Sequence, residues 1–328
     1  MQQKLRQTAL LLAGVLLLTA LGGCGKKKEQ VLIYTSVEDY VIEDLTARLK
    51  ETFPQYQVVV EYLSTGNHAA RLLSEGRRTR CDITYDLEYA YLEQLSRAEL
   101  LADLSAYDRS VYLEDTLAGQ DYLVQCRVGG AVILNTELLE EKGLPEPRSY
   151  EDLLDPAYKG LISMANPKSS GTGYMFYKSL VNAWGQQKAL AYFDRLTPNV
   201  LQYTSSGAGP VNALLQKEAA VALGMTSQAV KAIGEGAPLK IVYFAEGSPF
   251  TLYGQAILAG KETRPAVQEV FDYLVNTYSY RLNEIFFPEQ MFKDRVFTLE
   301  HYPQTIVYSD MQNNTLEEKT ALLDLWKH

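Results

Sequence analysis

The sequence predicts an α/β protein whose two lobes are joined like a clamshell. Short β-rich runs alternate with amphipathic helical runs in each half of the chain, a pattern typical of a central sheet with helices on both faces. Two longer β-rich runs, residues 122–135 and 250–260, can cross from one lobe to the other. With 328 residues, of which 47% are hydrophobic, the chain can build two cores.

The elements of the first lobe follow from hydrophobic periodicity. Strands are predicted over residues 31–36, 57–64 and 81–87, and helices over residues 37–53, 66–76 and 88–100. The strands are runs of β-branched and aromatic residues, whereas the first helix repeats apolar residues at Val41, Leu45 and Leu49. Strands that alternate with helices predict a parallel sheet.

The second lobe repeats this alternation after the crossing at residues 122–135. Strands are predicted over residues 161–167, 200–205, 219–225 and 239–247, and helices over residues 171–184, 186–198, 210–218 and 227–236. The second crossing returns the chain to the first lobe, and helices follow over residues 264–278 and 315–328. Lobe 1 is thus predicted as residues 31–130 plus 251–300, lobe 2 as residues 131–250, and a C-terminal helical segment as residues 301–328.

The N-terminus has the features of an export signal. Lys4 and Arg6 precede an uncharged apolar run that is short for a membrane-spanning helix and ends in "LGGC". This ending is similar to a bacterial lipobox, so residues 1–23 are predicted as a lipoprotein signal peptide and Cys24 as the lipid-attachment residue. Residues 24–30 would be a tether at the extracytoplasmic face of the plasma membrane. The alternative is an ordinary signal peptide.

Composition excludes several classes of function. The net charge is -9, and beyond Lys26–Lys28 no basic run occurs that could bind a nucleic-acid backbone. His68, His301 and His328 lie far apart without metal-ligand spacing, and no G-x-S-x-G motif occurs. We therefore expect no enzyme, cofactor or metal site, with an exported hydrolase as a remote alternative. Cys81 and Cys126 form either a disulfide or two buried thiols.

Hydroxyl side chains and glycines crowd the places where strands pass into helices. The candidate residues are Ser36, Ser64, Thr65, Gly66, Ser169, Ser170, Gly171, Thr172, Ser205 and Ser206. N-capping explains one hydroxyl at each helix start. The surplus of hydroxyls, with glycines that let a ligand approach backbone N–H groups, instead predicts a cradle for an oxyanion.

These motifs also carry a resemblance to a known family. "VLIYTSVED", "STG", the segment from Asn135 to Tyr174 and "QYTSSGAGP" resemble bacterial extracellular solute-binding proteins of ABC importers, in the branch of ferric-iron and 2-aminoethylphosphonate binders. The resemblance implies a type II periplasmic-binding fold, a clamshell of two lobes joined by two hinge strands. It also implies a monomer that binds one small anion or zwitterion and delivers it to a membrane permease and its ATPase.

The resemblance leaves the solute open. Iron binders of this branch use paired tyrosines, and no Tyr-Tyr pair occurs, so a phosphonate or phosphate-bearing solute is favoured over ferric iron. A sugar phosphate is a further alternative, and so is a sensor subunit instead of a transporter subunit. Tyr203, Asp86 and Tyr253 complete the predicted site. Asp86, Glu88 and Glu246 are candidates to hold an ammonium group, and Asp86 with Glu88 could instead be a helix N-terminal charge pair.

Overall fold

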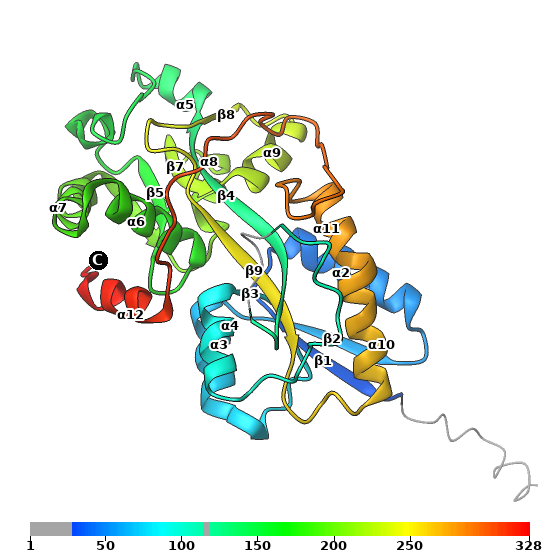
Figure 1. The fold of residues 1–328 in the computed structure, drawn as a ribbon. Coiled ribbons are helices and arrows are strands. Elements are labelled where there is room, and N and C mark those ends of the chain that lie inside the picture. Colours follow the sequence, from blue (N-terminus) through cyan, green and yellow to red (C-terminus); the bar gives the residue numbers. More distant parts are fainter. Residues whose placement is uncertain (1–27, 114–118) are drawn as a thin grey trace, which may run out of the picture.

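The computed structural model describes residues 28–113 and 119–328 (Figure 1). The predicted signal peptide, the predicted lipid-attachment residue Cys24 and most of the tether lie outside the described residues. Within the described ranges, no helix has the length and apolar character needed to span a bilayer.

Nine strands form one curled sheet in the order β2-β1-β3-β9-β4-β7-β5-β6, with β8 paired to β4. The strands are β1 (Gln30–Thr35), β2 (Gln57–Tyr62), β3 (Ile83–Glu88), β4 (Leu123–Asn135), β5 (Ile162–Ala165), β6 (Val200–Thr204), β7 (Val221–Met225), β8 (Leu239–Val242) and β9 (Phe250–Ile257). We call the half with β2, β1, β3 and β9 lobe 1, and the half with β7, β5, β6 and β8 lobe 2. β4 belongs to both.

Helices cover both halves of the sheet (Figure 1). They are α2 (Asp39–Thr52), α3 (Thr65–Glu75), α4 (Tyr89–Arg97), α5 (Thr136–Glu141), α6 (Gly171–Trp184), α7 (Gln186–Leu196), α8 (Gly209–Leu215), α9 (Thr226–Gly234), α10 (Pro265–Tyr273), α11 (Ser279–Ile285) and α12 (Leu316–Leu325). The sequence pattern did not predict α11, which continues from α10 through a π-helical turn at Leu274–Tyr278.

The long strand β4 crosses between the lobes and changes partner at a double glycine. Gly129 is the last residue paired with β9, and Gly130 is the first paired with β7. A Cβ atom at Gly129 would lie 2.5 Å from Glu289 Oε1, and one at Gly130 would lie 2.6 Å from Met175 Cε. Side chains packed against the crossing therefore require glycine at both positions.

The predicted parallel pairing is confirmed for β1 to β3 and for β5 to β7, whereas the two crossing strands, whose direction the sequence did not predict, are antiparallel to their neighbours. β9 runs antiparallel to β3 and β4, and β4 runs antiparallel to β7 and β8, whereas β1, β2 and β3 are mutually parallel, as are β5, β6 and β7. A strand that enters a lobe from the other side has no crossover helix to reverse its direction, so it joins the sheet antiparallel.

Separate hydrophobic clusters fill the two lobes. One cluster lies in lobe 1, and two others lie on opposite faces of the lobe 2 sheet. Alternate residues of β4 point into the two lobe 2 clusters, because successive side chains of a strand face opposite ways: Val132 and Leu134 enter one, Ala131 and Ile133 the other. Each lobe thus has its own core.

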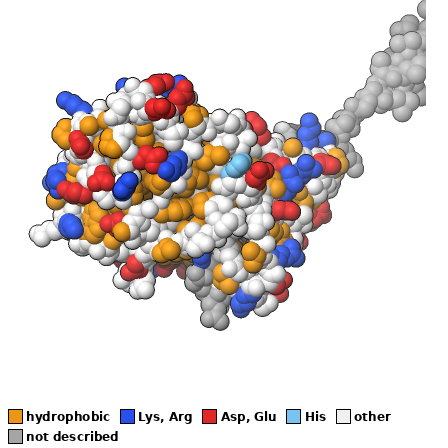
Figure 2. All heavy atoms as spheres, turned by 90° about the horizontal axis from the view of Figure 1, so that it is seen from above, with side chains coloured by type: hydrophobic (Ala, Val, Ile, Leu, Met, Phe, Trp, Pro, Cys, Tyr) orange, Lys and Arg blue, Asp and Glu red, His pale blue; other side chains and the backbone are white. Residues whose placement is uncertain are grey.

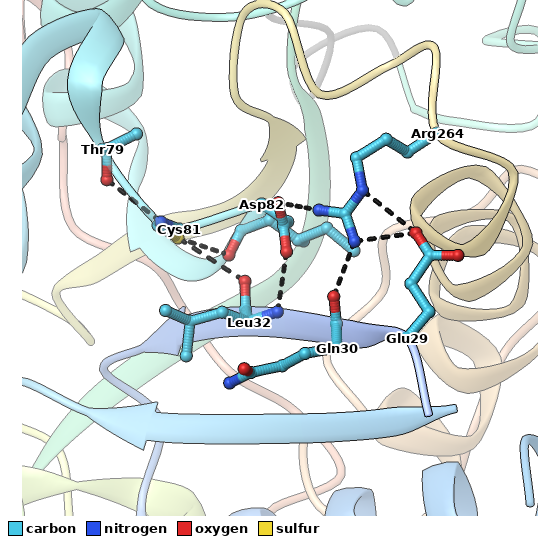
Figure 3. A network of polar contacts seen from close by, with 8 residues as sticks. Glu29, Gln30, Leu32, Thr79, Cys81, Asp82 and Arg264 are labelled. Atoms are coloured by element: carbon cyan, nitrogen blue, oxygen red, sulfur yellow. Dashed lines mark hydrogen bonds and ion pairs between the residues drawn. The ribbon is translucent and has the colours of Figure 1, made fainter. Parts of the chain in front are cut away.

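A polar network joins three distant segments of lobe 1 (Figure 3). Arg264, just before α10, donates to Asp82 Oδ1 at 2.6 Å and to the carbonyl oxygen of Gln30 at 2.6 Å, and it pairs with Glu29. The other oxygen of Asp82 accepts the N–H of Leu32 at 2.9 Å. The network fixes the start of β1 beside the returning chain.

The two described cysteines are free thiols, and both are buried. Cys81 donates to the carbonyl oxygen of Ile83 at 3.1 Å, whereas Cys126 lies 3.8 Å from Asp86 Oδ1. Burial raises the pKa of both thiols. The sequence left a disulfide and two buried thiols as alternatives, and the structure shows two buried thiols.

The C-terminal helix α12 belongs to lobe 2 but also touches lobe 1. Trp326 packs against Tyr177 and Phe193 of the lobe 2 core. On the other side, buried Lys319 forms an ion pair with buried Glu88 at the end of β3. The helix therefore links the lobes on the side of β3 and α4, as Figure 1 shows.

Candidate functional site

A cavity of about 500 Å³ lies between the lobes. Its lining consists of Ser36, Glu38, Asp39, Tyr62, Leu63, Ser64, Thr65, Asn67, Asp86, Val128, Ser169, Ser170, Thr172, Ser205, Ser206, Gly207, Ala208, Asn212, Met225, Tyr253 and Phe287. The ends of β1, β2 and β3 supply the lobe 1 side, and the segments before α6 and α8 supply the lobe 2 side. Loops at the carboxyl ends of parallel strands are where α/β sheets bind ligands.

Most of the candidate residues predicted from the sequence meet at this cavity, although they come from six separate segments. Those in the lining are Ser36, Ser64, Thr65, Asp86, Ser169, Ser170, Thr172, Ser205, Ser206 and Tyr253. The other three, Gly66, Gly171 and Tyr203, are not part of the lining.

Gly66 and Gly171 lie where the lobes touch. The N–H of Gly66 donates to the carbonyl oxygen of Ser169 at 3.4 Å, and a Cβ atom at Gly66 would lie 2.9 Å from the carbonyl oxygen of Lys168. A Cβ atom at Gly171 would lie 2.4 Å from the hydroxyl of Tyr253. These glycines therefore let one lobe approach the other, a different role from the predicted approach to a ligand.

Tyr203 points away from the cavity, contrary to its predicted place in the site. Its hydroxyl lies 2.8 Å from Thr197 Oγ1, and its ring packs against Trp326 and stacks on His328. Tyr203 is thus a partner of the C-terminal segment.

The helix starts at the cavity are not capped by their own hydroxyls. Ser64 is the N-cap residue of α3 and Ser170 that of α6, and neither side chain accepts a hydrogen bond from its helix. Both hydroxyls, with Thr65 and Thr172 beside them, line the cavity. The capping alternative therefore fails at both helices. The hydroxyls and the first-turn N–H groups other than that of Gly66, which donates to Ser169, can bond to a bound molecule.

Close approach of small residues gathers the lobe 2 hydroxyls. A Cβ atom at Gly207 would lie 2.5 Å from Thr172 Oγ1 and 3.4 Å from Ser170 Oγ. Glycine at this position thus lets the segment with Ser205 and Ser206 lie against the start of α6. The lobe 2 wall presents these hydroxyls together with the positive end of the α6 dipole.

The lobe 1 wall is acidic. Glu38, Asp39 and Asp86 line the cavity, and the described lining holds neither lysine nor arginine. Asp86 has a left-handed backbone with φ of 56° and is buried, and Gln125 donates to its Oδ1 at 3.0 Å. Burial, and then the charge of Glu38, raises the pKa of Asp86 well above its usual range. Burial raises the pKa of Glu38 to about 7.

A chain of hydrogen bonds lies behind this wall. Ser36 Oγ donates to the carbonyl oxygen of Asp86 at 2.6 Å and lies 3.2 Å from His68 Nδ1. The other ring nitrogen of His68 lies 3.0 Å from Thr84 Oγ1. His68 is fully buried, and burial followed by the charge of Arg71 lowers its pKa to about 3. The imidazole is therefore neutral.

The two remaining acidic candidates do not line the cavity. Glu88 is buried with Lys319 and also accepts from Thr251 Oγ1 at 3.3 Å. Neither sequence interpretation of Glu88, an ammonium ligand or a helix N-terminal charge, describes this ion pair. Glu246 accepts from Trp184 Nε1 at 3.1 Å. Both carboxylates have partners within the protein.

Sequence reasoning missed several lining residues. The most informative are Glu38 and Asp39, which follow Ser36 directly at the end of β1. Their position at a strand end, beside the candidate residue Ser36, could have indicated that they belong to the site. Nothing in the sequence indicates this for Asn212 and Phe287, because they reach the cavity from α8 and from the loop after α11.

Charges on the face of the molecule seen in Figure 2 are dispersed. Figure 2 shows one face of the molecule, on which acidic and basic side chains are interspersed without a continuous basic patch. This surface, with the net charge of -9, offers no long-range attraction for a polyanion. An anion in the cavity would be held by short-range hydrogen bonds.

Comparison with known proteins places these features in a family. The profile of the family described as bacterial extracellular solute-binding protein matches residues 90–291. A protein of Haemophilus influenzae, named only as uncharacterized, is 29% identical over 261 residues, which is 77% of this chain and 73% of the relative.

Solved structures show the same fold. The periplasmic binding protein P5PA superposes with a TM-score of 0.80 at 23% identity, over 91% of this chain and 98% of P5PA. AfuA from Actinobacillus pleuropneumoniae, with fructose-6-phosphate bound, has a TM-score of 0.78 at 23% identity, over 92% and 98% of the two chains. Iron-bound HitA from Pseudomonas aeruginosa has a TM-score of 0.75 at 20% identity, over 91% and 100%.

Proposed function

Since this chain belongs to the bacterial extracellular solute-binding protein family, we propose that it captures a small phosphonate or phosphate-bearing solute, similar to 2-aminoethylphosphonate, for an ABC importer. The solute would bind in the cavity between the lobes and pass to a membrane permease served by a cytoplasmic ATPase. Family and fold are those of transport binding proteins.

The main support for this proposal comes from the two helix starts that lack a side-chain cap, those of α3 and α6. Ser64 and Ser170 occupy N-cap positions without capping, and they face a common cavity with Thr65 and Thr172. A group with several acceptor oxygens can take these hydroxyls and the N–H groups of the first helical turns together. A phosphonate or phosphate has three such oxygens, so it matches this set of donors.

Ferric iron and sugar phosphates are the alternatives. Two tyrosines, Tyr62 and Tyr253, line the cavity, and burial raises the pKa of both phenols, which opposes the ionised form that binds iron. Among the described residues, no group of three or more His, Cys, Asp or Glu could hold a metal ion. AfuA, with fructose-6-phosphate bound, favours the sugar phosphate as the stronger alternative.

Hydrolysis, the remote alternative, is opposed by the direction of the hydrogen bonds at Ser36. A nucleophilic serine gives its proton to a histidine in the transition state. Here the Ser36 hydroxyl already donates to the carbonyl oxygen of Asp86. His68, with a pKa lowered to about 3, is too weak a base to take that proton at neutral pH.

We also propose that residues 31–130 with 251–300 and residues 131–250 move as two lobes that close on the solute. The contacts of Gly66 and Gly171 across the cavity would form on closure, and differential affinity for the closed state would drive it. The protein would be a monomer, anchored at the extracytoplasmic face of the membrane by lipid on Cys24.

A thermal-shift screen of residues 25–328 tests the proposal. The panel contains 2-aminoethylphosphonate, phosphonoacetate, fructose-6-phosphate, inorganic phosphate and ferric citrate. A ligand at about 100 times its Kd should stabilise the protein by about 2.7 kcal/mol. A shift with a phosphonate or phosphate ester supports the proposal, whereas a shift with ferric citrate alone overturns it.

A further inference from the structure

Behind the lobe 1 wall, His68 contacts the cavity-lining residue Ser36, and what this contact implies for a ligand rests on the proposed function. Ser36 is the only hydroxyl in the described lining whose side chain is recorded with two partners behind the wall, the carbonyl oxygen of Asp86 at 2.6 Å and His68 Nδ1 at 3.2 Å. Those two contacts determine what Ser36 can offer to a ligand.

The directions of the hydrogen bonds follow from the chemistry of the partners. A carbonyl oxygen can only accept, so the single proton of Ser36 is directed to Asp86. The contact with His68 then requires the proton to be on Nδ1, which donates to Ser36 Oγ. Nε2 of the neutral ring is left without a proton and accepts from Thr84 Oγ1 at 3.0 Å. The three bonds run in one direction, from Thr84 to Asp86.

Because its hydroxyl proton is directed to Asp86, Ser36 cannot donate a hydrogen bond to a ligand in the cavity. One lone pair of its oxygen is used by His68, and the other remains for a ligand. It lies beside the carboxyl groups of Glu38 and Asp86 in a wall whose described lining holds neither lysine nor arginine. This end of the cavity accepts hydrogen bonds, whereas the start of α6 donates them. The Ser36 hydroxyl is therefore not part of the predicted oxyanion cradle, because an oxyanion needs a donor.

We propose that His68 is a positioning residue that holds Ser36 as a hydrogen-bond acceptor, so that the lobe 1 end of the cavity selects solutes carrying a protonated amine opposite the phosphonate or phosphate group. The ammonium would donate to Ser36 and to carboxyl oxygens of Glu38 and Asp86, and its positive charge would lower the raised pKa of both groups and favour their ionised forms. Such a ligand is a zwitterion, and its charges match the two walls. A solute with an uncharged, apolar end would leave the acceptors unpaired.

Matched ligands test the inference by isothermal titration calorimetry. 2-Aminoethylphosphonate and propylphosphonate have the same number of heavy atoms in line, with ammonium in the first and methyl in the second. The measured quantity is the ratio of their Kd values. We expect the wild-type protein to favour the ammonium ligand at least about tenfold, since hydrogen bonds to charged groups are strong.

Variants separate positioning from a structural role. Ser36→Ala and His68→Leu should reduce the ratio of Kd values severalfold, whereas His68→Asn should preserve it, because the Asn amide can place an N–H close to the Nδ1 position. If His68→Leu weakens both ligands equally and leaves the ratio unchanged, His68 is only a packing residue and the inference is overturned. Ser36→Ala supplies the same test if the buried substitution prevents folding.

The two proposals fail in different ways. Equal binding of the two phosphonates by the wild-type protein contradicts the selection of a protonated amine but leaves the proposed function intact. If neither phosphonate binds to folded protein while fructose-6-phosphate does, a phosphate-bearing solute stands and the inference about the amine falls. Binding of ferric citrate alone overturns both.

Discussion

The helices of this protein begin in two different ways. At α5 and α12, the N-cap side chain serves the helix: Asn135 accepts from the N–H of Leu138 at 2.8 Å, and Thr315 accepts from the N–H of Glu318 at 3.2 Å. At α3 and α6, the N-cap residues Ser64 and Ser170 make no such bond and face the cavity. Residues with the same capping ability therefore differ in what they bond to.

A helix can form without a side-chain N-cap hydrogen bond when packing of its side chains stabilises it. Most of α6 is buried, including the aromatic residues Tyr174, Phe176 and Tyr177 in its first half, and burial of side chains of this size outweighs one hydrogen bond. In the short helix α5, only Leu138 and Leu139 are buried. The N-cap hydrogen bond therefore contributes a larger fraction of the stability of α5 than it would in α6.

The largest expected effect is the loss of affinity when an uncapped start loses its hydroxyls. Ser170→Ala combined with Thr172→Ala should weaken binding of the phosphonate or phosphate found in the screen on the order of 100-fold, because two hydrogen bonds to a charged group are removed. Calorimetric titration measures the Kd, and the melting temperature should stay within about 2 °C of wild type. Unchanged affinity would place the oxyanion elsewhere.

A capped start should show the reverse behaviour. Asn135→Ala removes the cap of α5 and also the bond from Asn135 Nδ2 to the carbonyl oxygen of Leu214 at 2.9 Å. We expect a loss of about 2 kcal/mol in the free energy of unfolding, with the Kd unchanged, measured by urea denaturation and titration.

Ser64→Ala is the matched control at an uncapped start. It should leave the free energy of unfolding within about 0.5 kcal/mol of wild type while weakening binding. A large loss of stability in Ser64→Ala would remove the distinction between the two kinds of helix start.

A smaller effect is expected where the start of α6 meets lobe 1. Gly171→Ala introduces a Cβ atom 2.4 Å from the Tyr253 hydroxyl, which should hinder closure and weaken binding about tenfold. Adding Tyr253→Phe removes that hydroxyl and should recover part of the lost affinity. Gly234→Ala is the control, because its nearest neighbour would be His301 Cδ2 at 3.8 Å. Equal effects of Gly171→Ala and Gly234→Ala would contradict a contact at the lobe interface.

The smallest effect concerns the acidic wall opposite these helix starts. The pKa of Glu38 is raised from 4.5 to about 7, so the folded protein disfavours its charge. Its stabilising contribution is present below pH 4.5 and is lost as the pH rises through about 7. Near Glu38 the cavity also holds Asp39, Asp86 and Tyr62, and Asp39 adds to the upward shift.

Glu38→Gln should therefore stabilise the ligand-free protein relative to wild type at pH 8 but not at pH 4, by on the order of 1 kcal/mol after screening by water in the cavity. Melting temperatures of both proteins across this pH range measure the difference. The buried His68 is present in both proteins, so its contribution to the pH dependence cancels in the difference between their melting temperatures. A difference independent of pH would show that the Glu38 charge is not the cause.

Much of the fold could be predicted from local patterns. Helix α6 was predicted with the bounds that the structure shows, because "GTGY" and the glycine after Trp184 mark its ends. The crossing at β4 was predicted from the length of an uninterrupted β-rich run. The direction of β4 and β9 in the sheet was not, since strand direction depends on where the chain enters a lobe.

The candidate site could be predicted only in part. The hydroxyls at strand ends were recognisable because their surplus exceeds what capping needs. Tyr203 was wrongly placed, because it lies near those hydroxyls in sequence but its ring turns to Trp326. Glu38 and Asp39 were overlooked, since acidic residues at the start of a helix are also favoured by the helix dipole.

The two alternating α/β halves, the long crossings and the gathering of hydroxyls and glycines at strand ends follow from local sequence, because they are properties of periodicity and residue type. The folded structure was needed to show which hydroxyls cap a helix and which face the cavity. It also showed that Gly66 and Gly171 serve contact between the lobes, and that Ser36 donates to Asp86 while His68 contacts its oxygen. Hydrogen-bond partners distant in the chain become neighbours only when the lobes are folded and packed against each other.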